Sequence, residues 1–153
     1  MPMKAPAYVL DTHVLVWFAK GHAHKLGLNS LMALLGRRAR IVVPSYALEE
    51  VQRQFSPSMR AGKDMLVPPT PLLRLILKCL NARVLPRGPA LLAEEFRLHK
   101  RHSSIPVQDI PIAAAVLVAK KYYDGPVLLA TCDRELKRWA GNMGIPVSGP
   151  LFL

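Results

Sequence analysis

Short apolar runs alternate with longer amphipathic segments along the whole chain. The short runs are rich in β-prone residues and predict buried strands at residues 8–10, 41–43, 84–85 and 127–130, with a last edge strand at 145–147. Apolar residues at three- and four-residue spacing predict helices at residues 14–20, 26–39, 46–55, 72–80, 91–102, 110–122 and 134–140. Residues 56–71 contain proline, glycine and serine, and we expect a loop there.

This alternation predicts an α/β fold. Parallel strands that are buried on both sides need helices on both faces of the sheet, so we expect three layers, α/β/α, around a central, mainly parallel sheet. Neither a repeat nor a low-complexity tract divides the chain, and we expect residues 1–153 to form a single domain. In sheets of this kind the functional groups gather beyond the carboxyl ends of the strands.

The charge balance indicates a polyanionic partner. Lys and Arg number 21 against 10 acids, which gives a formal net charge of +11. Nucleic acid is the first candidate, because basic side chains that bind it release its condensed counterions. An anionic membrane is a weaker candidate, since the longest strongly apolar stretch, 110–119, has about half of the ~20 residues that a spanning helix needs. We expect no membrane partner.

The cellular location is inferred from the N-terminus and from the cysteines. Asp11 and His13 interrupt the apolar N-terminal run, which is not typical of a secretory signal. Cys79 and Cys132 form no CxxC motif and no disulfide framework. The sequence leaves a bridge between them open, but two buried thiols in a reducing cytoplasm are the plainer expectation.

Acidic residues are few in so basic a chain, and their positions are informative. Asp11 directly follows the first strand, Asp133 lies three residues beyond strand 127–130, and Asp109 begins the helix before that strand. Glu49 and Glu50 follow strand 41–43. If the sheet is parallel, these carboxylates project toward the same edge. Carboxylate oxygens are the ligands that Mg²⁺ and Mn²⁺ prefer, and a divalent cation would relieve the repulsion among them.

Each acid also has an ordinary structural explanation. Asp109 and Asp133 suit the N-cap position of a helix, Asp11 suits a strand-to-helix turn, and Glu49 and Glu50 suit a solvated helix face. Helical geometry does not choose between the two glutamates, because both flank the apolar stripe of their helix. The joint placement of the acids, rather than any single one, favours a functional cluster.

Four segments in order resemble the motifs of the PIN-domain family, particularly VapC-like toxins and their archaeal relatives. Residues 8–15 are similar to the opening strand, which ends in Asp-Thr, and residues 42–51 to the second strand and helix. Residues 109–115 resemble the Asp-x-x-Ile-Ala-Ala motif, although Pro111 is unusual there, and residues 128–136 resemble the Thr-x-Asp-Arg motif, with Cys132 in place of the more usual Asn. Residues 54–108 align poorly.

The resemblance implies a PIN-like fold and a metal-dependent endoribonuclease, the toxin of a toxin–antitoxin pair, that hydrolyses RNA to a 5′-phosphate and a 3′-hydroxyl. The Pro44-Ser45 register of the family assigns the metal-binding role to Glu50 rather than Glu49. The implied catalytic and metal-binding set, for Mg²⁺ or Mn²⁺, is Asp11, Glu50, Asp109 and Asp133, with Thr131 and Thr12 orienting carboxylates or water. An antitoxin protein and a second copy of the chain are the implied partners. The basic residues expected to hold RNA phosphates are Arg37, Arg38, Arg40, Arg134 and Arg138.

Three other functions remain in view. An RNA-processing nuclease of the same fold would use the same acids, and the sequence does not separate it from a toxin. A catalytically silent RNA-binding module would gain nothing from carboxylates that repel phosphates. A phosphatase of the haloacid-dehalogenase type would need a second Asp two residues after the first, and His13 stands there.

Overall fold

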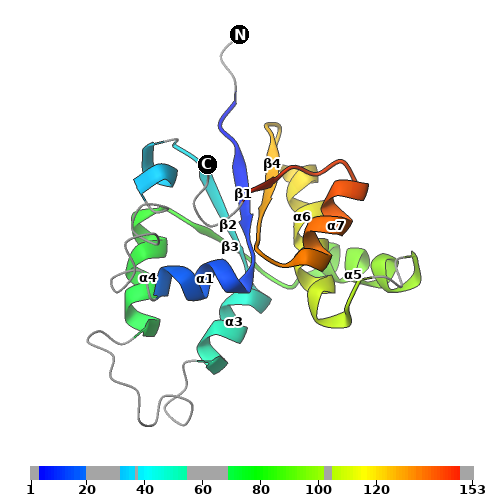
Figure 1. The fold of residues 1–153 in the computed structure, drawn as a ribbon, viewed down its shortest axis with the longest axis horizontal. Coiled ribbons are helices and arrows are strands. Elements are labelled where there is room, and N and C mark those ends of the chain that lie inside the picture. Colours follow the sequence, from blue (N-terminus) through cyan, green and yellow to red (C-terminus); the bar gives the residue numbers. More distant parts are fainter. Residues whose placement is uncertain (1–3, 20–31, 37, 55–68, 102–104, 149–153) are drawn as a thin grey trace.

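The structure, a computed structural model, describes residues 4–19, 32–36, 38–54, 69–101 and 105–148. Its centre is a five-stranded sheet in the order β3-β2-β1-β4-β5, and every neighbouring pair of strands is parallel (Figure 1). The strands are β1 (Ala7–Leu10), β2 (Arg40–Pro44), β3 (Arg83–Leu85), β4 (Val127–Ala130) and β5 (Val147–Ser148).

Helices cover both faces of the sheet. The helical elements are α1 (Thr12–Ala19), α3 (Ser45–Gln54), α4 (Pro69–Cys79), α5 (Pro89–Arg101), the 3₁₀ turn η2 (Val107–Asp109), α6 (Ile110–Tyr122) and α7 (Arg134–Asn142). Helices α1, α3 and α4 lie on one side, and α5, α6 and α7 lie on the other (Figure 1). The side changes because the chain first adds strands outward from β1 to β3 and then returns to β4 and β5, and parallel crossovers are right-handed. The predicted three-layer α/β/α architecture is confirmed.

The core explains why the central elements form where they do. All four residues of β1 are buried, and four of the five residues of β2 are buried. Helix α6 buries nine residues, including three consecutive alanines from Ala113 to Ala115. A helix this apolar on all sides is stable only when it is enclosed, and alanine lets it approach the sheet closely.

Two boundaries predicted from the sequence are wrong. Residues 69–71 were expected to end a loop, but α4 already begins at Pro69. Proline is favoured in the first turn of a helix, because its missing N–H has no intrahelical partner there. The last strand lies at Val147–Ser148, shifted from 145–147, and pairs with β4 at the edge of the sheet. Most of the helix predicted at 26–39 lies outside the described residues, although 32–36 are helical.

Helix ends follow one pattern that the sequence only partly signals. After 32–36, α4 and α7, a residue with positive φ reverses the chain: Arg38 (51°), Asn81 (53°) and Gly144 (70°). At each end two backbone N–H groups bond back to carbonyls of the last helical turn, as Ala82 does to Leu77 at 2.9 Å. Gly36 is helical, and Arg38 takes the left-handed position.

The cysteine expectation is wrong in one respect. Cys79 and Cys132 are both free, but both are exposed rather than buried. Cys79 ends α4 and Cys132 lies in the loop after β4, so neither side chain belongs to the layers that pack on the sheet. Within the described residues, no helix has the length and apolar character needed to cross a membrane.

A close backbone approach before β4 requires glycine. A Cβ built on Gly125 would lie 2.9 Å from the carbonyl oxygen of Ala5 and 2.8 Å from Nη2 of Arg40. Arg40 is itself held there, because Nη2 donates to the same Ala5 carbonyl at 2.7 Å and the guanidinium lies 4.6 Å from the Tyr123 ring centroid. Neither contact atom can move without disturbing β1 or β2.

We therefore expect Gly125→Ala to lower the free energy of unfolding by about 1–3 kcal/mol, the usual cost of overpacking. The control is Gly141→Ala in α7, where an added Cβ meets nothing within 4 Å and alanine should stabilise the helix by about 0.5–1 kcal/mol. Urea denaturation of both variants measures the difference. Equal stabilities would show that the Ala5–Gly125 contact relaxes without cost.

Candidate active site

The candidate site lies where the strand order reverses. β1 is the central strand, and its neighbours β2 and β4 are connected through helices on opposite faces of the sheet. Loops therefore diverge at the carboxyl ends of β1 and β4, where Leu10 pairs with Ala130. Crevices of this kind bind ligands in open α/β sheets. Asp11 and Thr131 are the first residues after these two strands, so both stand at the crevice.

Asp11 is buried and firmly held. Asp11 is 4% exposed, and its carboxylate accepts two short hydrogen bonds. The Thr12 N–H donates to Oδ1 at 2.6 Å, and the Thr131 hydroxyl donates to Oδ2 at 2.7 Å. Its backbone N–H donates to the Ala130 carbonyl at 3.0 Å, which continues the pairing of β1 with β4. Buried carboxylates need such donors, because an unpaired buried charge is costly.

Thr131 joins Asp11 to Asp133. Its fully buried side chain donates to Asp11, and its Oγ1 accepts the Asp133 N–H at 3.0 Å. Asp133 in turn caps α7, because Oδ1 accepts the Leu136 N–H at 3.0 Å. The capping explanation for Asp133 is thus confirmed. It leaves Oδ2 without a contact within the described part of the chain, so capping and a role in the cluster are compatible.

Asp109 is not a side-chain cap. It occupies the cap position of α6, but its side chain makes no capping hydrogen bond. Burial, followed by the negative charges of Asp133, Asp11 and Glu50 in that order, raises the pKa of Asp109 to about 6. The other three predicted acids therefore all lie within electrostatic range of Asp109. His13 acts in the opposite direction, and its Nδ1 lies 3.5 Å from Asp11 Oδ2.

The two neighbouring glutamates of α3 face different surroundings. Glu50 is half-buried, and its charge acts on Asp109. Glu49 is exposed, and its charge acts instead on Arg87. Tyr46 lies one helical turn before Glu50, and burial together with the neighbouring Glu50 carboxylate raises the pKa of Tyr46 to about 12. This placement supports Glu50 as the cluster member.

The acids suit a hard divalent cation in chemistry and charge. Among the described residues, no three His, Cys, Asp or Glu side chains form a ready-made metal-binding group. Burial is the main cause of the raised pKa of Asp109, and the negative charges of three other acids add to it. Carboxylate oxygens are the ligands that Mg²⁺ and Mn²⁺ prefer, so Asp11, Glu50, Asp109 and Asp133 would be the residues to hold one.

The basic residues expected at the site divide between two ends of the sheet. Arg134 and Arg138 belong to α7, which begins beside Asp133. Arg40 begins β2, and its contacts with Ala5 and Tyr123 place it at the amino end of the strands, opposite the acids. Arg40 therefore lies away from the acids, and its expected contact with RNA phosphates stays a prediction. Arg38 directly precedes that end of β2, and Arg37 lies outside the described residues.

Sequence reasoning missed three residues near the acids. Tyr46 was detectable, because it lies four residues before Glu50 on the same helix. His13 was discussed as the residue that stands where a phosphatase would need a second Asp, and its position beside Asp11 was not predicted. Arg87 carried no signal, because it lies in the poorly aligned region and reaches the site only through the fold.

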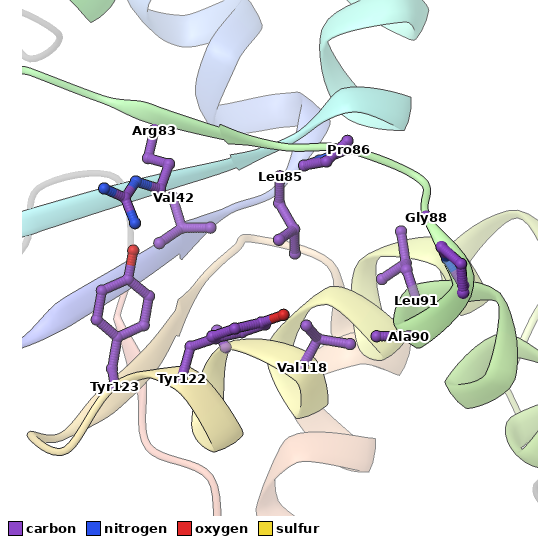
Figure 2. Close-up of a pocket in the computed structure, with 12 residues that line it drawn as sticks. Val42, Arg83, Leu85, Pro86, Gly88, Ala90, Leu91, Val118, Tyr122 and Tyr123 are labelled. Atoms are coloured by element: carbon purple, nitrogen blue, oxygen red, sulfur yellow. The ribbon is translucent and has the colours of Figure 1, made fainter.

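A separate apolar cavity of about 360 Å³ lies beside β3, α5 and α6 (Figure 2). Figure 2 shows Leu85, Val118 and Tyr122 turned toward it, with Arg83 and Tyr123 at one end. None of the four acids lines this cavity. It is therefore distinct from the candidate site.

Comparisons with known proteins identify a family and a related fold. The family described as PIN domain matches residues 8–142 of the chain. Among solved structures, the chain is similar to "Crystal structure of VapBC2 from Rickettsia felis bound to a DNA fragment from their promoter", with a TM-score of 0.63 and 17% sequence identity. That alignment covers 94% of this chain and 98% of the other. A search of curated proteins gives no match.

The raised pKa of Asp109 predicts how stability depends on pH. The folded protein binds the Asp109 proton more tightly than the unfolded chain, so this residue destabilises the fold increasingly as pH rises from about 4 to about 6. Asp109→Asn should therefore raise the melting temperature of metal-free protein at pH 7.5 more than at pH 4.5.

Asp124→Asn is the matched control. The Lys4 ammonium lowers the pKa of exposed Asp124, so removing this carboxylate should not stabilise the protein at either pH. Thermal denaturation in chelator measures both variants. A melting temperature of Asp109→Asn that equals or falls below wild type at pH 7.5 would mean that the ionised Asp109 carboxylate does not destabilise the fold, contrary to its raised pKa.

Proposed function

Because this chain belongs to the PIN domain family, whose members are nucleases and generally ribonucleases, we propose that it is a metal-dependent endoribonuclease. Its substrate in this proposal is RNA, its cofactor is Mg²⁺ or Mn²⁺, and its biological role is the toxin of a toxin–antitoxin pair. The observation that carries the proposal is the convergence of four carboxylates at the point where the strand order reverses. The charges of the other three acids contribute to the raised pKa of Asp109.

The chemistry follows from this arrangement. A bound divalent cation would supply an activated water and neutralise charge on the scissile phosphate. Asp11, Glu50, Asp109 and Asp133 would hold it. Thr131 fixes the Asp11 carboxylate through its 2.7 Å hydrogen bond, so that the oxygens of Asp11 keep one orientation when a ligand enters.

The positive charge of the chain outside the acidic cluster favours RNA as the substrate. The chain carries a net charge of +11, and Arg134 directly follows Asp133 at the start of α7. Phosphates repelled by the carboxylates would be attracted by such neighbouring basic residues, which fix the backbone without reading bases. A silent RNA-binding module has no use for the acids, so the cluster supports an enzyme.

The toxin role rests on the similarity of fold. The related solved structure is described as VapBC2 bound to promoter DNA, and its chain aligns over nearly the full length of this one. The proposal includes an antitoxin partner on this basis, and a homodimer from the family resemblance alone. An RNA-processing nuclease would share the acids but would not harm the cell that makes it.

Asp11→Asn tests the nuclease and the toxin together. The substitution keeps the shape of the side chain and removes its charge, so folding should persist while cleavage falls below detection. Wild-type protein should cleave single-stranded RNA with Mn²⁺ and lose this activity in EDTA. Induced expression of wild type, but not of Asp11→Asn, should arrest bacterial growth.

Cleavage that continues undiminished in EDTA on metal-stripped protein would exclude the metal mechanism. Cleavage in vitro without growth arrest would favour the RNA-processing role. A folded Asp11→Asn variant that cleaves like wild type would make Asp11 a structural residue.

The two adjacent glutamates give a matched pair of variants. Glu50 acts on Asp109 and Glu49 on Arg87, so Glu50→Gln should abolish Mn²⁺ binding and cleavage, whereas Glu49→Gln should keep cleavage within a few-fold of wild type. Titration calorimetry with Mn²⁺ and RNA turnover measure both. The reverse result would show that the assignment is one residue out of register.

A further inference from the structure

Tyr46 and Arg87 stand side by side because their strands pair in register. Pro44 at the end of β2 pairs with Leu85 at the end of β3. Each of the two residues follows its strand end by two positions, at the same carboxyl edge of the sheet. The guanidinium carbon of Arg87 lies 6.0 Å from the centroid of the Tyr46 ring. This contact joins α3 to the loop before α5.

Arg87 is held in place by the buried carboxylate of Glu95. Its Nε donates to Glu95 Oε2 at 3.0 Å and its Nη2 donates to Glu95 Oε1 at 2.8 Å. Glu95 belongs to α5 and is only 5% exposed. Two parallel bonds from a planar guanidinium to a carboxylate set orientation as well as distance. Arg87 is therefore a rigid support rather than a mobile surface cation.

The flanking residues keep this support in place. Pro86 and Gly88, on either side of Arg87, line the apolar cavity beside β3 (Figure 2). Proline restricts the backbone before Arg87, and the Gly88 N–H donates to the Pro86 carbonyl at 2.9 Å across it. The loop thus directs Arg87 away from the cavity wall and toward Glu95 and Tyr46.

Tyr46 carries the support on to Glu50. Tyr46 and Glu50 stand four residues apart on α3, so their side chains are neighbours on one face of the helix, and Glu50 raises the pKa of the Tyr46 hydroxyl. Glu50 needs such a restraint, because the charges of Asp11, Asp109 and Asp133 repel it toward solvent. A guanidinium bound directly to Glu50 would compete with a metal ion for the carboxylate. A neutral phenol orients the carboxylate and leaves its charge available.

Arg87 also separates the two adjacent glutamates. Its positive charge interacts with Glu49, and this attraction favours Glu49 on the Arg87 side of α3. Glu50 is thereby left facing Asp109. Arg87, held by Glu95, thus acts on Glu49 directly by charge and on Glu50 through Tyr46.

We propose that Tyr46 and Arg87 are positioning residues of the nuclease site, in which Arg87, braced by Glu95, holds the Tyr46 ring and the Tyr46 hydroxyl holds Glu50 toward the acidic cluster. The inference rests on the proposed function, because it assigns Glu50 to the metal. It extends that function to the loop after β3 and to α5, which contribute no acid to the cluster.

Tyr46→Phe tests the proposal with the smallest possible change. It removes the hydroxyl and keeps the ring under Arg87. Loss of an outer partner of a metal ligand typically costs about 10–100-fold in metal affinity. We expect a loss of this size in Mn²⁺ affinity by titration calorimetry, with the melting temperature of metal-free protein unchanged. In RNA cleavage kcat should fall while KM stays the same, because the substrate does not contact Tyr46.

Tyr123→Phe is the matched control. Tyr123 also lies beneath an arginine, Arg40, but at the opposite end of the strands. The same chemical change there should leave Mn²⁺ affinity at the wild-type value. A comparable loss in both variants would overturn the proposal, since the effect would then be general.

Arg87 requires a paired substitution. Arg87→Ala alone would leave buried Glu95 without its partner and would endanger the fold. Arg87→Met together with Glu95→Gln removes both charges at similar volume. We expect this double variant to weaken Mn²⁺ binding in the same direction as Tyr46→Phe, and to add little when combined with it, because the two act through one contact.

The outcomes separate the two proposals. Mn²⁺ binding by Tyr46→Phe within twofold of wild type, with binding lost in Glu50→Gln, would overturn the positioning role and leave the nuclease site intact. Failure of wild-type protein to bind Mn²⁺ would overturn both. Additive losses in the combined variant would overturn the link between Arg87 and Tyr46.

Discussion

The parallel pairing of β1 with both β2 and β4 is the constraint on which the rest of the structure depends. Because β1 lies between β2 and β4, the helices that connect the strands on its two sides lie on opposite faces of the sheet. The loops that follow β1 and β4 therefore diverge at the carboxyl end of β1. Asp11 occupies that point and Thr131 the equivalent point on β4. The other acids arrive from α3 and from the start of α6, so one edge of the sheet collects carboxylates from four distant parts of the chain.

Bringing these carboxylates together makes them repel one another, and local hydrogen bonds reduce this repulsion without removing it. Asp11 is buried with two donors, and Asp133 gives one oxygen to the cap of α7. Asp109 has no capping bond and retains a pKa near 6. The remaining repulsion is a cost to the fold that a cation would offset. Natural sites often keep such strain where binding or catalysis uses it.

Much of the fold was predictable because hydrophobic pattern and strand order are local or general properties. The runs at β1, β2 and β4 are buried strands, and α6 follows Asp109 as expected. Errors occurred where a residue has two competing uses. Proline signals a loop but also begins α4. Burial of Glu94 and Glu95 on α5 was missed, because their partners Lys121 and Arg87 come from outside that helix.

The sequence by itself determined the fold class, the family resemblance and the four acids, since each acid stands at a fixed distance from an apolar strand or helix. Tertiary structure alone decided three other points. It brought the charge of Glu50 to bear on Asp109 and that of Glu49 on Arg87, a difference that helical periodicity does not predict. It removed Arg40 from the acidic edge, because the start of a strand lies opposite its end. It brought Arg87 and Glu95 beside Tyr46, because strand register and side-chain packing join residues that no spacing along the chain connects.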